Sequence, residues 1–388
     1  MKNENLNCLI DLGSNKIKCA LFSQEGDQPN LIAFSEKETK GIHNSIIVNF
    51  NDAANTIRSV VSDIEKQSGL NLSKISILFE PIETIVTHLT KFKNMEGTKI
   101  EKEDINFLLR EAKKEIEKND KNMTQIHMFN SKYIVDNKVF HDIPINIFCD
   151  KLSLENTFIS IPKNILKNIS EVLQNCELEI DRFISTSYAN GLNLFDRYKL
   201  EQSCGIIDIG YEKTSIALFK NFSFYKLAVI PIGSNHITKD ISKICYLSKL
   251  DSESIKLDKS LFLNSENIQN DLNKLIPKNF FTKSKFRKIS IKFIEDIIIS
   301  RIHEISQIVF KELKDIDNYD TINRNLIYIG EGSKIIELGK TLDMDLDMTP
   351  EKIYKNSEKN VSINQLACYS GQNLLVKGWS KEAIATNY

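Results

Sequence analysis

The chain has 388 residues, of which 41% are hydrophobic and 27% are charged, as in an ordinary soluble globular protein. This length exceeds one compact core, so we expect at least two domains. The 51 basic and 52 acidic side chains leave a net charge of −1, which argues against a dedicated nucleic-acid-binding protein. No apolar run approaches the ~20 residues that span a bilayer. The amino terminus leads directly into a strand, so we expect no signal peptide.

The seven cysteines are scattered without a C-x-x-C pair, and the six histidines show no metal-ligand spacing. We therefore expect buried free thiols in a reducing cytoplasm, and no metal site built from these residues.

The first half of the chain predicts an α/β unit that is interrupted by a separate module. The unit begins with a hairpin over residues 8–22, followed by a strand over 31–35, a helix over 51–69 and a strand over 74–80. Residues 82–158 form the module: a strand over 83–92, a helix over 100–118 and a hairpin over 126–140 around Asp136-Asn137.

The second half repeats this order. A helix opened by Pro162, a strand over 178–186 and a helix from 187 lead into a second hairpin over 205–219, a strand over 222–233 and a helix over 236–244. A helical region over 245–325 contains a long amphipathic helix over 286–316. A strand, a glycine turn and a helix over 325–340 precede a last helix over 362–376. Two similar halves, each with an insert, imply a central cleft.

The two hairpins are near copies of each other, "CLIDLGSNKIKCALF" at 8–22 and "GIIDIGYEKTSIALF" at 205–219. In each, a glycine follows an Asp-x pair, so the bare backbone can bring several N–H groups close to a ligand. Such concave N–H groups suit phosphate oxygens, and each hydrogen bond to a charged group contributes about 1.5–3 kcal/mol. A single Asp-x-Gly is more often only a tight turn, but an equivalent pair favours two loops that grip one polyphosphate.

Asp11 and Asp208 would repel phosphates unless a divalent cation and its waters lay between them, so we expect both to contact Mg²⁺ through water. The stretch "IGEGSKI" places Gly330 and Gly332 between a strand and a helix, where bare backbone can support a base or ribose. Together the three glycine turns predict a nucleotide site.

Longer motifs resemble the FtsA family of the actin-like ATPase superfamily over nearly the whole chain. "KGIHNSIIVNFNDAANTIRSVV", "HMFNSKYIVDN", "LAVIPIGSNHITKDIS" and "IIISRIHEI" are each similar to a segment of that family. The resemblance implies an α/β, actin-like (ribonuclease H-like) duplicated fold with a central nucleotide cleft and an inserted small α+β domain of the SHS2 type. The implied parts are 1–81 with 159–196 and 367–388, the insert 82–158, 197–235 with 326–366, and a helical subdomain 236–325.

The resemblance also implies ATP with Mg²⁺ as cofactors, and it assigns the binding residues. The first phosphate loop is Asp11, Gly13, Ser14, Asn15 and Lys16, and the second is Asp208, Gly210, Tyr211 and Thr214, with Gly233 beside it. The ribose and base are assigned to Glu253 and Lys256, and the adenosine turn to Gly330, Gly332 and Ser333.

The partners implied by the resemblance are the carboxy-terminal tail of the tubulin-like FtsZ, other copies of the chain in a filament, and other division proteins through the insert. Arg301 and Glu304 fall beside the family's FtsZ-tail groove. The family attaches to the inner face of the cell membrane at the division site through a carboxy-terminal amphipathic helix. Here Leu375 and Trp379 would supply its apolar face, although a terminus that is frayed or docked on the fold fits the pattern equally well.

The sequence departs from the family at three turns. The second phosphate loop reads Gly210-Tyr211-Glu212-Lys213-Thr214 where the family has G-G-G-T-T, Glu331 replaces a glycine, and Ser234 replaces another. We therefore expect a weak ATPase at most. The alternatives to a division adaptor are an adaptor of the type IV pilus apparatus and a small-molecule kinase of the same superfamily; for the kinase we find no carboxylate base outside the two hairpins.

Overall fold

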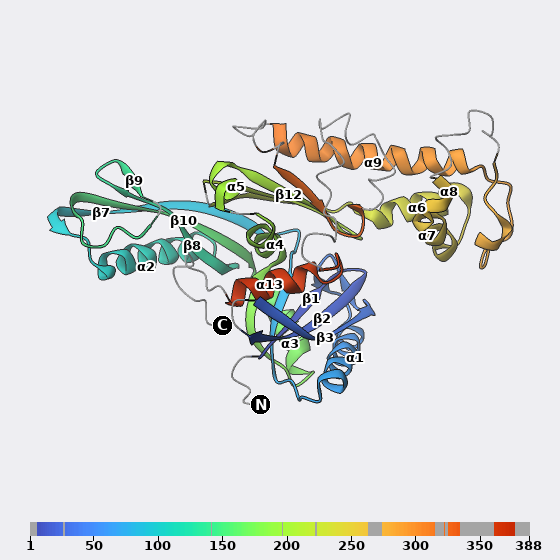
Figure 1. Cartoon of the computed structure of the whole chain (residues 1–388), viewed down its shortest axis with the longest axis horizontal. Coiled ribbons are helices and arrows are strands. Elements are labelled where there is room, and N and C mark those ends of the chain that lie inside the picture. The colour runs from blue at the N-terminus through green and yellow to red at the C-terminus, as the bar shows by residue number, and fades with distance from the viewer. Residues whose placement is uncertain are drawn as a thin grey trace. The chain divides into compact units, whose positions relative to one another are not determined.

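The computed structural model describes residues 6–25, 28–140, 142–195, 197–221, 223–262, 274–314, 322, 325–333 and 361–376. The chain forms two compact units (Figure 1). Unit 1 comprises Met1–Cys204, Ala217–Val229 and Ser357–Tyr388, and unit 2 comprises Gly205–Ile216 and Ile230–Asn356.

Unit 1 contains a five-stranded sheet in the order β11-β6-β1-β2-β3. Its strands are β1 (Leu6–Leu12), β2 (Lys16–Glu25), β3 (Gln28–Glu38), β6 (Lys74–Phe79) and β11 (Glu179–Ser185). β1, β6 and β11 run parallel, and their register places Asp11 beside Leu78 and Leu78 beside Ile184. Asp11 therefore lies at the carboxyl ends of three parallel strands, the edge at which open α/β sheets bind ligands.

Four helices and a small ribbon complete this part of unit 1: α1 (Phe50–Ser68), α3 (Lys163–Gln174), α4 (Thr186–Leu194), α13 (Leu366–Val376), and the pair β4 (Ile42–His43) and β5 (Ile46–Ile47). Helix α1 shows how local sequence fixes its ends. The Asn49 side chain accepts from the Asp52 N–H at 3.1 Å, and Gly69 closes the helix with a left-handed φ of 70°. The apolar stripe of this helix, which includes Ile57 and Val61, is buried.

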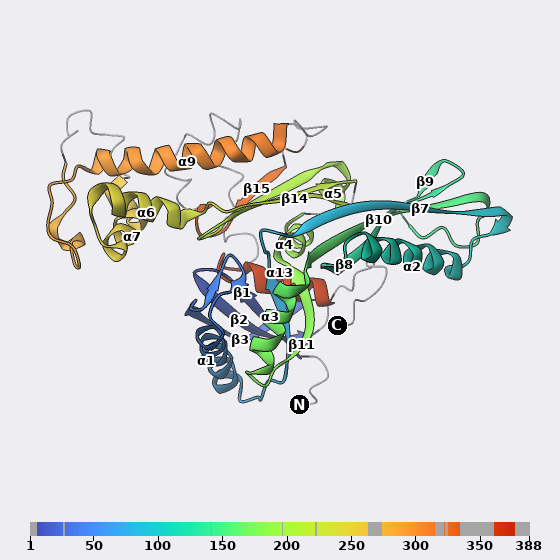
Figure 2. The same cartoon turned by 180° about the vertical axis from the view of Figure 1, so that it is seen from behind.

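The predicted insert is a helix on a four-stranded sheet of order β7-β10-β8-β9. Its elements are β7 (Ile85–Lys99), α2 (Lys102–Asn119), β8 (Met123–Val135), β9 (Lys138–Phe140) and β10 (Phe148–Pro162). Figure 2 shows α2 lying along the sheet. The predicted hairpin is present, with positive φ at both Asp136 and Asn137, as in a type I′ turn.

A second sheet has the order β14-β13-β12-β15. Its strands are β12 (Cys204–Ile209), β13 (Thr214–Lys220), β14 (Ser223–Ile230) and β15 (Leu326–Ile329), and the short helix α5 (Arg197–Gln202) precedes them. In unit 1, the hairpin end of β13 and β14 is tied to the insert by hydroxyl groups. The hydroxyl oxygens of Ser131 and Thr157 lie 2.6 Å apart, and each lies 2.9 Å from the hydroxyl oxygen of Ser223.

The helices of unit 2 are α6 (Ser234–Cys245), α7 (Lys249–Leu257), α8 (Lys259–Phe262), the 3₁₀ turn η2 (Lys278–Phe280) and α9 (Ile291–Lys314). The predicted long helix starts later than expected, at Ile291 instead of residue 286. The reason is a non-local pairing: the Ile276 N–H donates to the Ile289 carbonyl at 2.9 Å, and the Ile291 N–H to the Lys274 carbonyl at 2.8 Å. This pairing includes a bridge between Leu275 and Ser290, which keeps the chain extended up to the first residue of the helix.

All seven cysteines are free, and all are buried except Cys176, which is half-buried. Burial raises the pKa of the Cys368 and Cys176 thiols, so the thiols are unreactive members of the core. Within the described part of the chain, no helix combines the length and apolar character needed to cross a bilayer.

In the core of unit 1, Gly191 of α4 packs against a cluster of aromatic rings. Tyr188 of α4 stacks on Phe129 with ring centroids 4.8 Å apart, and Phe219 packs on Phe224 at 5.0 Å. A Cβ on Gly191 would overlap the ring of Phe219. Only glycine lets α4 approach the rings this closely.

We predict that Gly191→Ala lowers the free energy of unfolding by about 1–3 kcal/mol through overpacking, measured by urea denaturation. Phe219→Leu relieves the overlap, so the double variant should lose less stability than the sum of the two single variants. Additive losses would contradict the direct contact.

Candidate functional site

The two Asp-x-Gly loops have the same geometry. A Cβ on Gly13 would lie 2.5 Å from the Lys16 carbonyl oxygen, and a Cβ on Gly210 would lie 3.0 Å from the Lys213 carbonyl oxygen. In the second loop, the Gly210 N–H donates to that Lys213 carbonyl at 2.9 Å. At the same place in both loops, therefore, glycine avoids a close contact with the carbonyl oxygen three residues ahead, and this contact would be closer in the first loop than in the second.

The first loop, between β1 and β2, is held by Thr39. The Thr39 hydroxyl donates to the Gly13 carbonyl at 2.7 Å, and the Thr39 N–H donates to the Asn15 carbonyl at 2.8 Å. Ser14 Oγ is buried and has no hydrogen-bond partner among the described residues. Buried hydroxyl groups usually have a partner, so this one is available to a ligand. Lys16 Nζ forms an ion pair with Glu36 of the neighbouring strand.

The second loop, between β12 and β13, is held by the start of α6. The Ser234 and Asn235 N–H groups donate to the Gly210 and Tyr211 carbonyls at 2.9 and 2.8 Å. A Cβ on Gly233 would lie 2.6 Å from the Tyr211 carbonyl oxygen, so Gly233 is needed for this close approach. In both loops, therefore, internal donors occupy carbonyl oxygens and fix the turn.

Thr214 follows the second loop but does not present its hydroxyl there. Its side chain is fully buried, and its Oγ1 donates to the Ile232 carbonyl at 2.7 Å. In this arrangement the hydroxyl joins β13 to the end of β14.

The predicted adenosine turn packs directly on the second loop within unit 2. Gly330 has a left-handed φ of 87°, and a Cβ there would overlap the Asp208 carboxylate. The Gly332 N–H donates to the Ile209 carbonyl at 2.9 Å, and Ser333 Oγ closes the turn on the Gly330 carbonyl at 2.6 Å. The structure thus brings Asp208, Gly330 and Gly332 together, and glycine is needed at both positions because a side chain would overlap Asp208 or Ile209.

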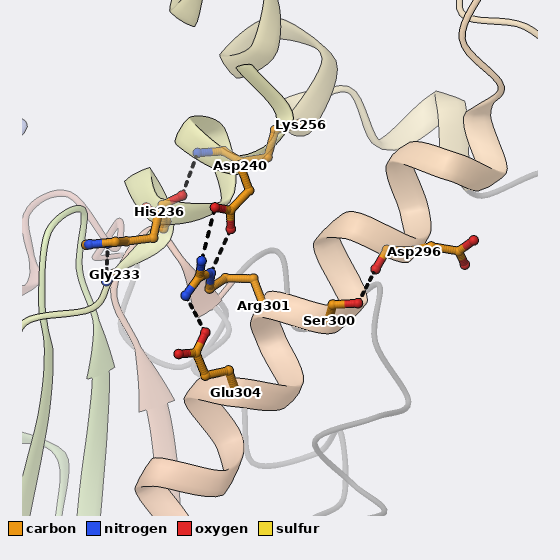
Figure 3. Close-up of polar contacts among 9 residues, drawn as sticks. Gly233, His236, Asp240, Lys256, Asp296, Ser300, Arg301 and Glu304 are labelled. Carbon is orange, nitrogen blue, oxygen red and sulfur yellow. Dashed lines mark hydrogen bonds and ion pairs between the residues drawn. The ribbon is translucent and has the colours of Figure 1, made fainter. Parts of the chain in front are cut away.

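Glu253 and Lys256 lie on α7 and are joined to α6. The buried Lys256 Nζ donates to Glu253 at 2.7 Å, to Thr238 Oγ1 at 2.8 Å and to the Ser234 carbonyl at 3.3 Å, and Figure 3 shows Lys256 reaching α6. Burial lowers the pKa of Lys256, and the Glu253 carboxylate acts against that shift. All three N–H groups of the ammonium have acceptors. In this conformation Lys256 therefore joins α7 to the first turn of α6, the helix that holds the second loop.

Arg301 of α9 forms a two-pronged ion pair with α6 (Figure 3). Its Nε and Nη2 donate to Asp240 at 2.7 and 3.0 Å, and its Nη1 pairs with Glu304. The hydrogen bond to Asp240 is the main cause of the raised pKa of Arg301. Arg301 and Glu304 are therefore adjacent, as the motif predicts, and Asp240 is a partner that the assignment did not include, although it lies in the quoted segment "LAVIPIGSNHITKDIS".

His236, in the first turn of α6, accepts the Gly233 N–H at Nδ1 at 3.2 Å. Burial is the main cause of its lowered pKa, and Lys239 adds to the shift. The neutral ring thus helps to cap the helix that holds the second loop.

Asp251 of α7 is a buried carboxylate that sequence reasoning missed. It accepts the N–H groups of Thr282, Lys283 and Ser284 and the Thr282 hydroxyl at 2.7–3.2 Å. Burial alone would raise the pKa of Asp251, but these hydrogen bonds hold it well below its usual range. No periodic pattern in the sequence signals such a contact between distant segments.

We predict that Asp251 makes unit 2 sensitive to acid. Because its pKa is lowered on folding, its contribution is present above the ordinary Asp pKa of about 3.9 and is lost as the pH falls below it. Asp251→Asn should lower stability at neutral pH by about 1–3 kcal/mol, and its urea midpoint should fall less than that of the wild type between neutral pH and pH ~3. Parallel pH profiles for the two proteins would contradict this role.

Of the two residues assigned to the membrane anchor, the structure describes only Leu375. Leu375 is half-buried near the end of α13, a helix that packs in unit 1, where a Cβ on Gly371 would lie 2.5 Å from Leu9 Cδ2. Trp379 lies outside the described residues. Within the described residues, no cluster of three His, Cys, Asp or Glu side chains could hold a metal ion.

Comparisons with known proteins agree with this architecture. A family model described as "Cell division protein FtsA" matches residues 205–371. The FtsA of Agrobacterium fabrum is 19% identical over 351 residues, which cover 88% of this chain and 79% of the relative.

Among solved structures, the PilM–PilN type IV pilus biogenesis complex superposes with a TM-score of 0.64 at 13% identity, covering 97% of this chain and 100% of that chain. MreB5 of Spiroplasma citri bound to AMPPNP superposes with a TM-score of 0.54 at 12% identity, covering 95% of this chain and 96% of that chain. These likenesses confirm the actin-like fold that the sequence predicts.

Proposed function

We propose, from its similarity to the FtsA cell-division proteins, that the chain is a cell-division adaptor that binds ATP, assembles into filaments and links FtsZ to the cytoplasmic membrane. The observation that carries the proposal is the pair of equivalent Asp-x-Gly loops, each with its carbonyl oxygens engaged by internal donors. A loop fixed in this way can offer its N–H groups to phosphates without reorganising.

The residues present fit a nucleotide. The covered Ser14 hydroxyl lacks a partner among the described residues, and the 330–333 turn packs directly against Asp208. We assign the phosphates to the two loops, the adenosine to the 330–333 turn, and Mg²⁺ to Asp11 and Asp208 through water. The crystal structure of MreB5 with AMPPNP provides a nucleotide-bound example of the same fold.

The first test of this proposal is a calorimetric titration with Mg-ATP. We predict micromolar binding, near −8 kcal/mol, and affinity about 10–100-fold weaker for Asp208→Ala, because one charged contact is worth about 1.5–3 kcal/mol. Asp142→Ala, which removes an exposed acidic side chain from the insert, is the matched control and should bind like the wild type. Equal affinity for Asp208→Ala and the control would rule out the assigned role.

We place the FtsZ tail at the surface of α9 that carries Arg301 and Glu304. Arg301 is only partly buried, with a side-chain exposure of 23%, so part of its side chain is accessible to a peptide. Its pair with Asp240 fixes the orientation of the guanidinium, as a two-pronged geometry does.

Two variants separate a direct contact from a structural one. If Arg301 touches the peptide, Arg301→Ala should weaken binding of an FtsZ-tail peptide at least tenfold, measured by fluorescence anisotropy. Asp240→Ala removes the carboxylate that orients the guanidinium but keeps its positive charge on α9, so it should weaken binding less than Arg301→Ala does. If both variants lose affinity equally, Arg301 serves only to join α6 and α9, and the tail binds elsewhere.

A type IV pilus adaptor remains the alternative. The PilM–PilN complex shares the fold, but at 13% identity it carries no argument beyond the fold. The match to the FtsA family over residues 205–371 favours cell division. Contacts with other division proteins through the insert, and attachment through Trp379, belong to the same proposal.

A further inference from the structure

One segment of unit 2 has a charge unlike that of the chain as a whole. Residues 274–290, which we call the basic excursion, contain no acidic side chain, in a chain whose net charge is −1. All of its basic side chains are exposed: Lys274, Lys278, Lys283, Lys285, Arg287 and Lys288. A segment that carries only basic side chains attracts anionic partners.

The basic excursion is held in place at its base and near its tip. At the base, the Ile276 N–H donates to the Ile289 carbonyl at 2.9 Å, and both side chains are buried. Near the tip, the Asp251 carboxylate accepts three consecutive backbone N–H groups, and the Ser248 N–H donates to Ser284 Oγ at 2.7 Å. The surface is therefore preformed, and binding to it costs little ordering entropy.

Within the described part of unit 2, the acidic side chains next to the excursion are engaged elsewhere. Asp251, an acidic side chain in contact with the excursion, uses its oxygens on backbone N–H groups and the Thr282 hydroxyl. Lys292, just beyond the excursion, pairs with Glu295 and Asp296. Among the described residues, the six basic side chains of the excursion make no such ion pair.

Large apolar side chains project from the same surface. Tyr246 is 75% exposed and lies under the Arg287 guanidinium at 5.3 Å, and Phe286 is 43% exposed with Lys278 over its ring at 5.3 Å. Leu250, in the first turn of α7, is 68% exposed. These exposed apolar side chains therefore lie next to the exposed basic ones.

We propose that the basic excursion, together with Tyr246 and Leu250, docks on a bilayer that contains anionic lipids. Basic side chains attract the headgroups, and projecting aromatic and aliphatic groups enter the interface between headgroups and acyl chains. The exposed leucine and aromatic side chains beside the basic ones favour a bilayer over an acidic peptide or a nucleic acid, because attraction by the basic side chains alone would serve those two partners. The inference adds a second contact to the membrane link proposed above, independent of the carboxy-terminal tail.

The test is flotation of the full chain with phosphatidylcholine vesicles, with and without phosphatidylglycerol. The test variant is Lys283→Glu/Lys285→Glu/Lys288→Glu. The control, Lys118→Glu/Lys121→Glu/Lys138→Glu, makes the same charge change at exposed positions of the insert. A surface lysine contributes about fivefold in affinity, so the test variant should need roughly a hundredfold more anionic lipid than the wild type. The control should float like the wild type, and salt should weaken wild-type binding.

Three results would overturn the inference: no wild-type binding to anionic vesicles, equal binding by the test variant and the control, or preferential binding of an oligonucleotide that the test variant alone loses. The variant Trp379→Glu distinguishes binding by the carboxy-terminal tail from binding by the basic excursion. It should still float with anionic vesicles, and this binding should still depend on Lys283, Lys285 and Lys288. Mg-ATP and FtsZ-tail titrations of the test variant should match the wild type, so failure of this inference is distinct from failure of the proposed function.

Discussion

Three backbone segments meet at the end of β12, and none of them has room for a side chain at its point of contact. A Cβ on Gly233 would lie 2.6 Å from the Tyr211 carbonyl oxygen, a Cβ on Gly332 would lie 2.5 Å from Ile209 Cγ2, and a Cβ on Gly330 would overlap Asp208. This convergence fixes the hairpin turn, the start of α6 and the predicted adenosine turn against one another. The site in unit 2 therefore rests on close backbone packing, with side chains placed around it.

Helix α6 contacts both the second loop and the other helices of unit 2 that are discussed above. Its first N–H groups hold the second loop, and Asp240 in its middle pairs with Arg301 of α9 (Figure 3). Tyr246, directly after its last residue, belongs to the surface for which we propose lipid binding. Lys256 braces its first turn from α7. One helix thus contacts the elements to which we assign nucleotide, FtsZ tail and membrane. In unit 1, Thr39 performs for the first loop the task that α6 performs for the second.

Much of this could be predicted from the sequence because the signals are local. The periodicity of α1 and α2, the turn at Asp136-Asn137 and the repeated Asp-x-Gly loops all depend on neighbouring residues. The sequence could not reveal contacts that close over long separations. The late start of α9, the use of the Thr214 hydroxyl inside the sheet and the capture of residues 282–284 by Asp251 each depend on a partner from another segment. Asp240 was visible in a motif, but its pairing with Arg301 needed the fold.

The central claim is that the two equivalent loops act on one nucleotide. Amide hydrogen exchange, followed with and without Mg-ATP, tests it most directly because it reports each loop separately. The account predicts that residues 13–16 and residues 210–214 gain protection together, over the same range of ATP concentration. Protection of only one loop, or of neither at ATP concentrations that saturate binding, would contradict it.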